Sequence, residues 1–136
     1  MIHALGIQHI GLIVPDVRKA EQWYTETMGF ARKGEFHTAS GIHAVFVRSD
    51  TLDVMYELIQ HPQGSDIQRR AEVCGGWMDH IAYETEDLEA EMEHAKKLGA
   101  LIIEGIVDVP EFWDNGFRYF LLRAPGGEKV EFCKVL

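Results

Sequence analysis

The pattern of residues from Gly6 to Val14 is typical of a β-strand, with His9, Gly11 and Ile13 on one face and Ile10, Leu12 and Val14 on the other. Pro15 ends this strand, and Asp16 is suited to cap a following helix. The apolar positions of that helix recur at helical spacing: Val17, Ala20, Trp23, Tyr24 and Met28. Three more strands are predicted over residues 30–38, 42–48 and 52–60. The predicted order of elements in the first half of the chain is therefore β-α-β-β-β.

The same order of elements is predicted again in the second half of the chain. His80 follows His9, and Asp87 follows Asp16, by the same offset of 71 residues (80 − 9 and 87 − 16). The second helix carries its apolar side chains on one stripe: Leu88, Met92, Ala95 and Leu98. Further strands are predicted over residues 101–109, 116–123 and 128–135. The second half is thus again β-α-β-β-β.

This duplication predicts an α+β fold built from two tandem βαβββ modules in a single domain, 1–136. The modules span about residues 5–60 and 77–136, and a polar connection over residues 61–76 joins them. The chain of 136 residues is 46% hydrophobic, which is enough to bury a core of its own. Two similar modules packed side by side bring equivalent positions of their sheets together.

Each predicted module has one histidine on its first strand and one glutamate on its last. His9 precedes Glu57 by 48 residues (57 − 9), and His80 precedes Glu131 by 51 (131 − 80). Strand alternation places all four side chains on the face opposite the residues that pack against a helix. A single histidine or glutamate on a strand is usually a hydrogen-bonded or solvated residue. A pair repeated at matching positions instead favours a metal site.

The chemistry of these four side chains narrows the choice of ion. A buried carboxylate is costly unless it is paired or coordinates a cation. Two imidazoles and two carboxylates that converge would satisfy that requirement with one divalent ion. Nitrogen and oxygen donors suit Zn, Ni, Co, Mn or Fe, and they do not suit an ion that prefers thiolate ligands. Four protein ligands also leave one or two positions for water or substrate, as a catalytic site requires.

Composition restricts the partners and the compartment that we expect. The chain has 13 Lys and Arg against 22 Asp and Glu, and the net charge of −9 disfavours nucleic acid and membrane partners. The first residues lack the basic and apolar segments of a secretory signal, so a cytoplasmic protein is expected. Cys74 and Cys133 are predicted to be free thiols.

Several other residues are candidates for lesser roles. Three arginines could hold a substrate carboxylate or phosphate, although solvation is the commoner fate: Arg48, Arg118 and Arg123. Phe112 and Trp113 could form a mobile lid or a dimer contact. No role is predicted for three further histidines: His3, His61 and His94.

The chain resembles the vicinal oxygen chelate superfamily over nearly its whole length. Five segments carry the resemblance: residues 7–12 (IQHIGL), 24–30 (YTETMGF), 56–58 (YEL), 78–83 (MDHIAY) and 124–132 (APGGEKVEF). The family includes glyoxalase I, methylmalonyl-CoA epimerase, extradiol dioxygenases, fosfomycin-resistance enzymes and bleomycin-binding proteins. The resemblance implies paired βαβββ modules that form a cupped sheet around a metal-binding cavity. It places the metal ligands at His9, Glu57, His80 and Glu131.

The complete donor set is similar to that of bacterial glyoxalase I (lactoylglutathione lyase). This similarity implies a divalent-metal-dependent lyase or isomerase that transfers a proton alpha to a carbonyl through a metal-stabilised enediolate. Glu131 is the first choice as the catalytic base, and Glu57 is the second. The similarity also implies one divalent ion (Zn, Ni, Co or Mn), a small-molecule substrate and a homodimer.

Other members of the family remain alternatives. The segment after Glu57 looks like methylmalonyl-CoA epimerase, although that pattern usually has glutamine at position 57. The second catalytic glutamate of the epimerase falls near Ala39 or Ser40, so Glu35, His37 or His43 could take its place. The arginine that closely follows the first histidine of glyoxalase I is also absent here. A metal-dependent dioxygenase is a third reading, although such enzymes generally use two histidines and the last glutamate only. A drug-binding resistance protein is the fourth.

Overall fold

A computed structural model describes residues 1–136, and it contains eight strands and three helices in the order β-α-β-β-β-α-β-α-β-β-β. The chain divides into two compact units. One comprises residues 9–79, and the other combines residues 80–136 with residues 1–8. The predicted α+β class is confirmed, as are both βαβββ sequences of elements. No helix combines the length and the apolar character that a membrane crossing requires.

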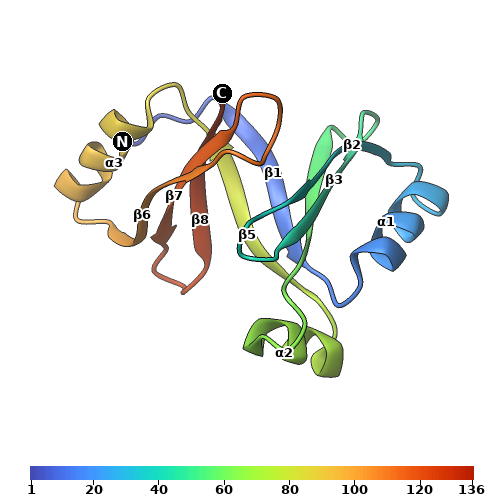
Figure 1. Cartoon of the computed structure of the whole chain (residues 1–136). Helices are drawn as coiled ribbons and strands as arrows, with labels where there is room; N and C mark the ends of the chain where they lie inside the picture. Colours follow the sequence, from blue (N-terminus) through green and yellow to red (C-terminus); the bar gives the residue numbers. More distant parts are fainter. The chain divides into compact units, whose positions relative to one another are not determined.

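The unit of residues 9–79 contains a four-stranded sheet with the order β2-β3-β4-β1 (Figure 1). Its strands are β1 (Gly6–Ile13), β2 (Ala31–His37), β3 (His43–Ser49) and β4 (Val54–Gln60). Strands β1 and β4 are parallel, whereas β3 is antiparallel to both of its neighbours. Helix α1 (Val17–Glu26) crosses from β1 to β2 and packs against β3 and β4.

Helix α1 begins where the sequence predicts. The Asp16 side chain accepts a hydrogen bond from the Lys19 backbone N–H at 3.0 Å, which satisfies one of the free donors of the first turn. The helix covers one apolar cluster: Val17, Phe30, Val45, Val47 and Leu58. Trp23 and Met28, expected on the same stripe, are about half exposed. Met28 lies beyond the end of the helix at Glu26, and the Trp23 ring lies edge-on to Tyr24.

The connection between the modules contains a helix, α2 (Asp66–Cys74), that the hydrophobic pattern did not predict. Ser65 caps it by accepting from the Gln68 backbone N–H at 3.2 Å. Its buried residues are Gln68 and Ala71, so no apolar stripe marks it in the sequence. Ala71 packs against Ile13 and Ile59, which share the sheet face opposite α1.

The unit of residues 1–8 and 80–136 repeats this topology with the strand order β6-β7-β8-β5. Its elements are β5 (Trp77–Glu84), α3 (Leu88–Lys97), β6 (Leu101–Val109), β7 (Phe117–Arg123) and β8 (Lys129–Val135). Asp87 caps α3 by accepting from the Ala90 backbone N–H at 2.9 Å. The helix covers a second apolar cluster: Leu88, Ala95, Phe120, Leu122 and Phe132.

The first residues of the chain pack with this unit and not with the module that follows them. The Leu5 backbone N–H donates to the Glu84 carbonyl at 2.8 Å. Ile2 lies against the apolar cluster beneath α3. The N-terminal segment is therefore held by both the end of β5 and the core of the second half.

Candidate metal centre

A histidine and a glutamate meet on the sheet of the unit formed by residues 9–79. His9 on β1 is 1% exposed and Glu57 on β4 is 7% exposed, and His9 Nε2 lies 3.2 Å from Glu57 Oε2. The parallel pairing of β1 with β4 produces this contact, because it sets Gly11, two residues after His9, opposite Glu57. The Phe46 ring lies edge-on to the His9 imidazole, with ring centroids 5.4 Å apart. The pair is thus shielded from water beside an aromatic ring.

An equivalent pair lies on the sheet of the other unit. His80 on β5 is 7% exposed and Glu131 on β8 is 5% exposed, with His80 Nε2 at 3.4 Å from Glu131 Oε2. The parallel pairing of β5 with β8 sets Ala82, two residues after His80, opposite Glu131. The register of the second pair therefore reproduces that of the first.

The side-chain directions predicted from strand alternation are confirmed. On β4, Tyr56 and Leu58 pack toward α1, which leaves Glu57 on the opposite face. On β8, Val130 and Phe132 pack with the cluster beneath α3, which leaves Glu131 on the opposite face. Each module thus uses one face of its sheet for a core and the other for a His–Glu pair.

The donor set of each pair suits a divalent ion. Metal–ligand bonds of about 2.0–2.2 Å separate two neighbouring ligands of one ion by about 3.0–3.4 Å. The nitrogen-to-oxygen distances of 3.2 and 3.4 Å lie close to that range. An imidazole and a carboxylate, held together away from water, are ligands that Zn and related ions accept.

The residues suggested as replacements for a second epimerase base lie on the wrong face of their sheet. Glu35 pairs with Val45 in the register of β2 and β3, and Val45 belongs to the core beneath α1. The Glu35 carboxylate contacts both Arg18 and Arg32, and His43 Nε2 lies 2.8 Å from Glu35 Oε1. His37 stacks on His43 with ring centroids 4.0 Å apart. Because Glu57 pairs with Phe46 on the other face, these three residues do not line the site of Glu57.

The arginines suggested for substrate binding have protein partners of their own. Arg48 contacts Asp50 and Asp53 at 3.0 and 2.6 Å. Arg118 contacts Glu89 and Asp108 at 2.8 and 2.7 Å. Arg123 Nη1 donates to the Gly127 carbonyl at 2.7 Å. A substrate anion would have to compete with these contacts, so the structure gives no support to that role.

Two further predictions have different outcomes. The Phe112 side chain is 5% exposed and its ring lies 6.0 Å from that of Phe117, so it is a packed residue and not part of an exposed lid. Trp113 follows it with a positive φ of 58°, within the turn that joins β6 to β7. Cys74 and Cys133 form no disulfide, as predicted, and Cys74 is exposed whereas Cys133 is buried.

Comparison with known proteins gives the family. The sequence profile of the glyoxalase/bleomycin resistance protein/dioxygenase superfamily matches residues 8–118. The uncharacterized protein YwbC of Bacillus subtilis (strain 168) is 36% identical over 132 residues, which cover 95% of this chain and 97% of that protein. The 4-hydroxyphenylpyruvate dioxygenase of Caenorhabditis elegans is 29% identical over 126 residues, 90% of this chain but 32% of the enzyme.

A solved structure shares the fold. Methylmalonyl-CoA epimerase from Mycobacterium tuberculosis matches with a TM-score of 0.79 and 18% identity, covering 98% of this chain and 89% of the epimerase. At that identity the likeness concerns the fold and not the activity. The profile match and the relative at 36% identity together show that the chain belongs to the glyoxalase/bleomycin resistance protein/dioxygenase superfamily.

Proposed function

We propose that this protein is a divalent-metal-dependent lyase or isomerase of the glyoxalase I type, which transfers a proton at a carbon next to a carbonyl group. The observation that supports the proposal is the buried His–Glu pair that occurs in the same strand register in both units. In this proposal His9, Glu57, His80 and Glu131 bind one ion together. Their residue types match the complete donor set that the family resemblance implies.

The chain's own residues would contribute in three ways. The two imidazoles and the two carboxylates together supply two negative charges, which balance the charge of a divalent ion. Their burial keeps bulk water from the reacting groups and strengthens electrostatic interactions with a substrate oxygen. The ion would supply the positive charge that stabilises an oxyanion while the neighbouring carbon loses its proton.

Glu131 is the proposed base, and its carboxylate would accept the proton from the substrate carbon. A carboxylate that can loosen from an ion is able to serve as ligand and as base in turn. Glu57 has the equivalent position in the other module and is the second choice. A small-molecule substrate and a homodimer are part of the same proposal, by likeness to the family.

Two other activities have specific support. The resemblance of the segment after Glu57 to methylmalonyl-CoA epimerase, whose fold this chain shares, favours an epimerase-like racemase in which Glu57 and Glu131 would serve as the two acid–base groups. The 4-hydroxyphenylpyruvate dioxygenase of Caenorhabditis elegans, at 29% identity, favours a metal-dependent dioxygenase. Each activity has its own readout, since only the dioxygenase consumes oxygen and only the racemase inverts a stereocentre.

The test is a chelator and metal-replacement series on the purified protein. Activity is measured as solvent deuterium that enters the hemithioacetal of methylglyoxal, other α-hydroxycarbonyl compounds or methylmalonyl-CoA. We expect exchange to stop on chelation and to return with Zn, Ni, Co or Mn. Glu131→Gln, with metal content measured in parallel, is expected to lower the exchange rate by about 10²-fold or more, because the base is removed.

The matched control is Glu128→Gln, which removes an exposed carboxylate just before the same strand and is expected to change nothing. Unchanged exchange in Glu131→Gln that still carries its metal would contradict the choice of base. Exchange that survives complete removal of metal would contradict the proposed mechanism. Oxygen uptake with Fe²⁺ would instead identify a dioxygenase, and binding without any exchange would identify a drug-binding protein.

A further inference from the structure

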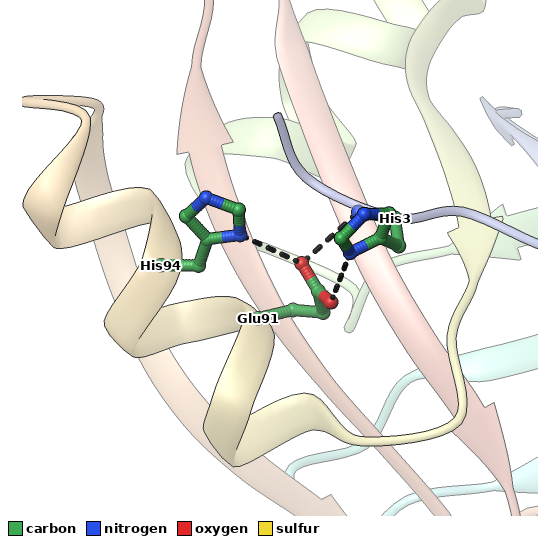
Figure 2. A group of neighbouring side chains, drawn as sticks. All are labelled: His3, Glu91 and His94. Carbon is green, nitrogen blue, oxygen red and sulfur yellow. Dashed lines mark hydrogen bonds and ion pairs between the residues drawn. The ribbon is translucent and has the colours of Figure 1, made fainter.

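A second group of donor side chains lies in the unit of residues 1–8 and 80–136, on the helix side of its sheet. His3 comes from the N-terminal segment, and Glu91 and His94 come from α3 (Figure 2). Helix α3 packs on the face that holds Val130 and Phe132, which is opposite the face of Glu131. The group is therefore separate from the His80–Glu131 pair. No role was predicted for His3 and His94 from the sequence.

The three side chains converge on the carboxylate of Glu91. His3 Nδ1 lies 3.2 Å from Glu91 Oε1, and His94 Nδ1 lies 3.7 Å from Glu91 Oε2. Ligand atoms of all three lie within 4.8 Å of one another. Two ligands on one tetrahedral ion are about 3.3 Å apart, so an ion could enter with a small change of rotamer. Figure 2 shows both imidazoles directed toward the carboxylate.

The backbone already orients the acidic donor of this group. The His3 backbone N–H donates to Glu91 Oε2 at 3.0 Å, which fixes the carboxylate in the way that outer hydrogen bonds fix metal ligands. Burial raises the pKa of Glu91, but the hydrogen bonds from the His3 backbone and side chain outweigh it and hold the pKa below its usual value. The carboxylate is thus ionised at neutral pH.

The charge around Glu91 differs from that around the other exposed cluster, Glu35, His37 and His43. Glu35 is neutralised by two guanidinium groups, which also repel a cation. The side-chain contacts of Glu91 are with His3 and His94, and no guanidinium or ammonium group pairs with it. His94 also lies in the last turn of α3, where the partial negative charge of the helix end favours a cation.

We propose that His3, Glu91 and His94 form a second binding site for a divalent transition-metal ion such as Zn²⁺, with water completing the coordination. The Glu91-x-x-His94 spacing supplies two ligands from one helix face, and His3 supplies the third. The site is open to the ion, because the His3 and His94 side chains are 76% and 32% exposed while Glu91 is 11% exposed.

Binding at this site would hold the N-terminal segment against α3. Residues 1–5 precede β1 and contact the unit through Ile2, His3 and the Leu5 backbone. An ion bound by both His3 and the helix cross-links the two, and any ligand that binds only the folded state raises its stability. The site therefore has a stabilising role that is independent of catalysis.

The test is a Zn²⁺ titration of the full chain by calorimetry, together with the Zn²⁺-dependent change in melting temperature. The main variant is His94→Gln, which keeps a helix-compatible residue at a partly exposed position. We expect the wild type to bind one more Zn²⁺ than His94→Gln, or to bind it at least tenfold more tightly. Glu91→Gln removes the shared carboxylate and is expected to give the same loss.

The matched controls are Glu93→Gln, a carboxylate on the same helix that contacts Lys96, and His37→Gln, an exposed histidine of the other cluster. Both are expected to bind Zn²⁺ as the wild type does. An unchanged Zn²⁺ count and affinity in His94→Gln, or a loss in His37→Gln, would overturn the proposal. Because the variants leave His9, Glu57, His80 and Glu131 intact, a failure here is distinguishable from a failure of the proposed activity, which is measured by deuterium exchange.

Discussion

At the scale of single residues, His9 and His80 are the buried histidines of the chain, whereas Glu57 and Glu131 share their burial with Glu21 and Glu91. His9, Glu57, His80 and Glu131 are each less than a tenth exposed, and each is oriented by strand pairing. The spacing of the duplicated sequence predicted these four residues as metal ligands. No site was predicted at His3, Glu91 and His94, because His3 is 88 residues from Glu91 and only the Glu91-x-x-His94 spacing marks them in the sequence.

Gly76 lies so close to the backbone of Ile13 that no side chain fits at this position. A Cβ atom at this position would lie 2.2 Å from the Ile13 carbonyl oxygen, where backbone must shift to admit it. Gly76→Ala is therefore expected to lower the free energy of unfolding by about 1–3 kcal/mol, as overpacking does. Urea unfolding measures the change.

Gly105→Ala is the matched control, because a Cβ there meets nothing within 4 Å and the backbone has no positive φ. It is expected to be neutral or slightly stabilising. Equal stability of the two variants would show that the contact between Gly76 and Ile13 is not tight in solution.

At the scale of elements, an ion-pair network joins α1 to β2. The hydrogen bond from Arg32 is the main cause that lowers the pKa of Glu21, with a smaller contribution from Arg18. A carboxyl group whose pKa is lowered by folding contributes stability above its ordinary pKa of about 4.3. That contribution is lost as the pH falls through the lowered pKa of the folded state.

Arg32→Met is therefore expected to lower stability at pH 7 by no more than about 1 kcal/mol, since Arg32 is 46% exposed. The difference from the wild type should shrink toward zero as Glu21 becomes protonated in acid. Urea unfolding across a pH series, with Lys33→Met as an exposed control on the same strand, measures this convergence. A difference that is the same at every pH would exclude the ion pair as its source.

The sequence predicted most elements for clear physical reasons, and the exceptions are equally physical. Asp16 and Asp87 marked two helix starts because their side chains accept from backbone N–H groups three residues later. Helix α2 was missed because its buried positions are a glutamine and an alanine. The position of Glu35 was also missed, because a register shift between Arg32 and Gly34 and the pairing with β3 decide its face.

At the scale of the whole molecule, duplication is the feature that connects fold and proposed function. Each unit builds a four-stranded sheet in the same strand order, with a helix-covered core on one face and a His–Glu pair on the other. One module supplies only two ligands, which are too few to bind an ion firmly. A duplicated module supplies four, and this is why the proposal assigns one ion to both pairs.

The most direct test of this assignment is a crystal structure of the protein grown with Zn²⁺ or Ni²⁺, with anomalous scattering recorded at the metal edge. We expect one ion bonded to His9 and His80 nitrogens and to Glu57 and Glu131 oxygens, at about 2.0–2.2 Å. This expectation holds whether or not a second ion lies at His3. Separate ions on the two His–Glu pairs, or no ion at either, would contradict the proposed metal centre.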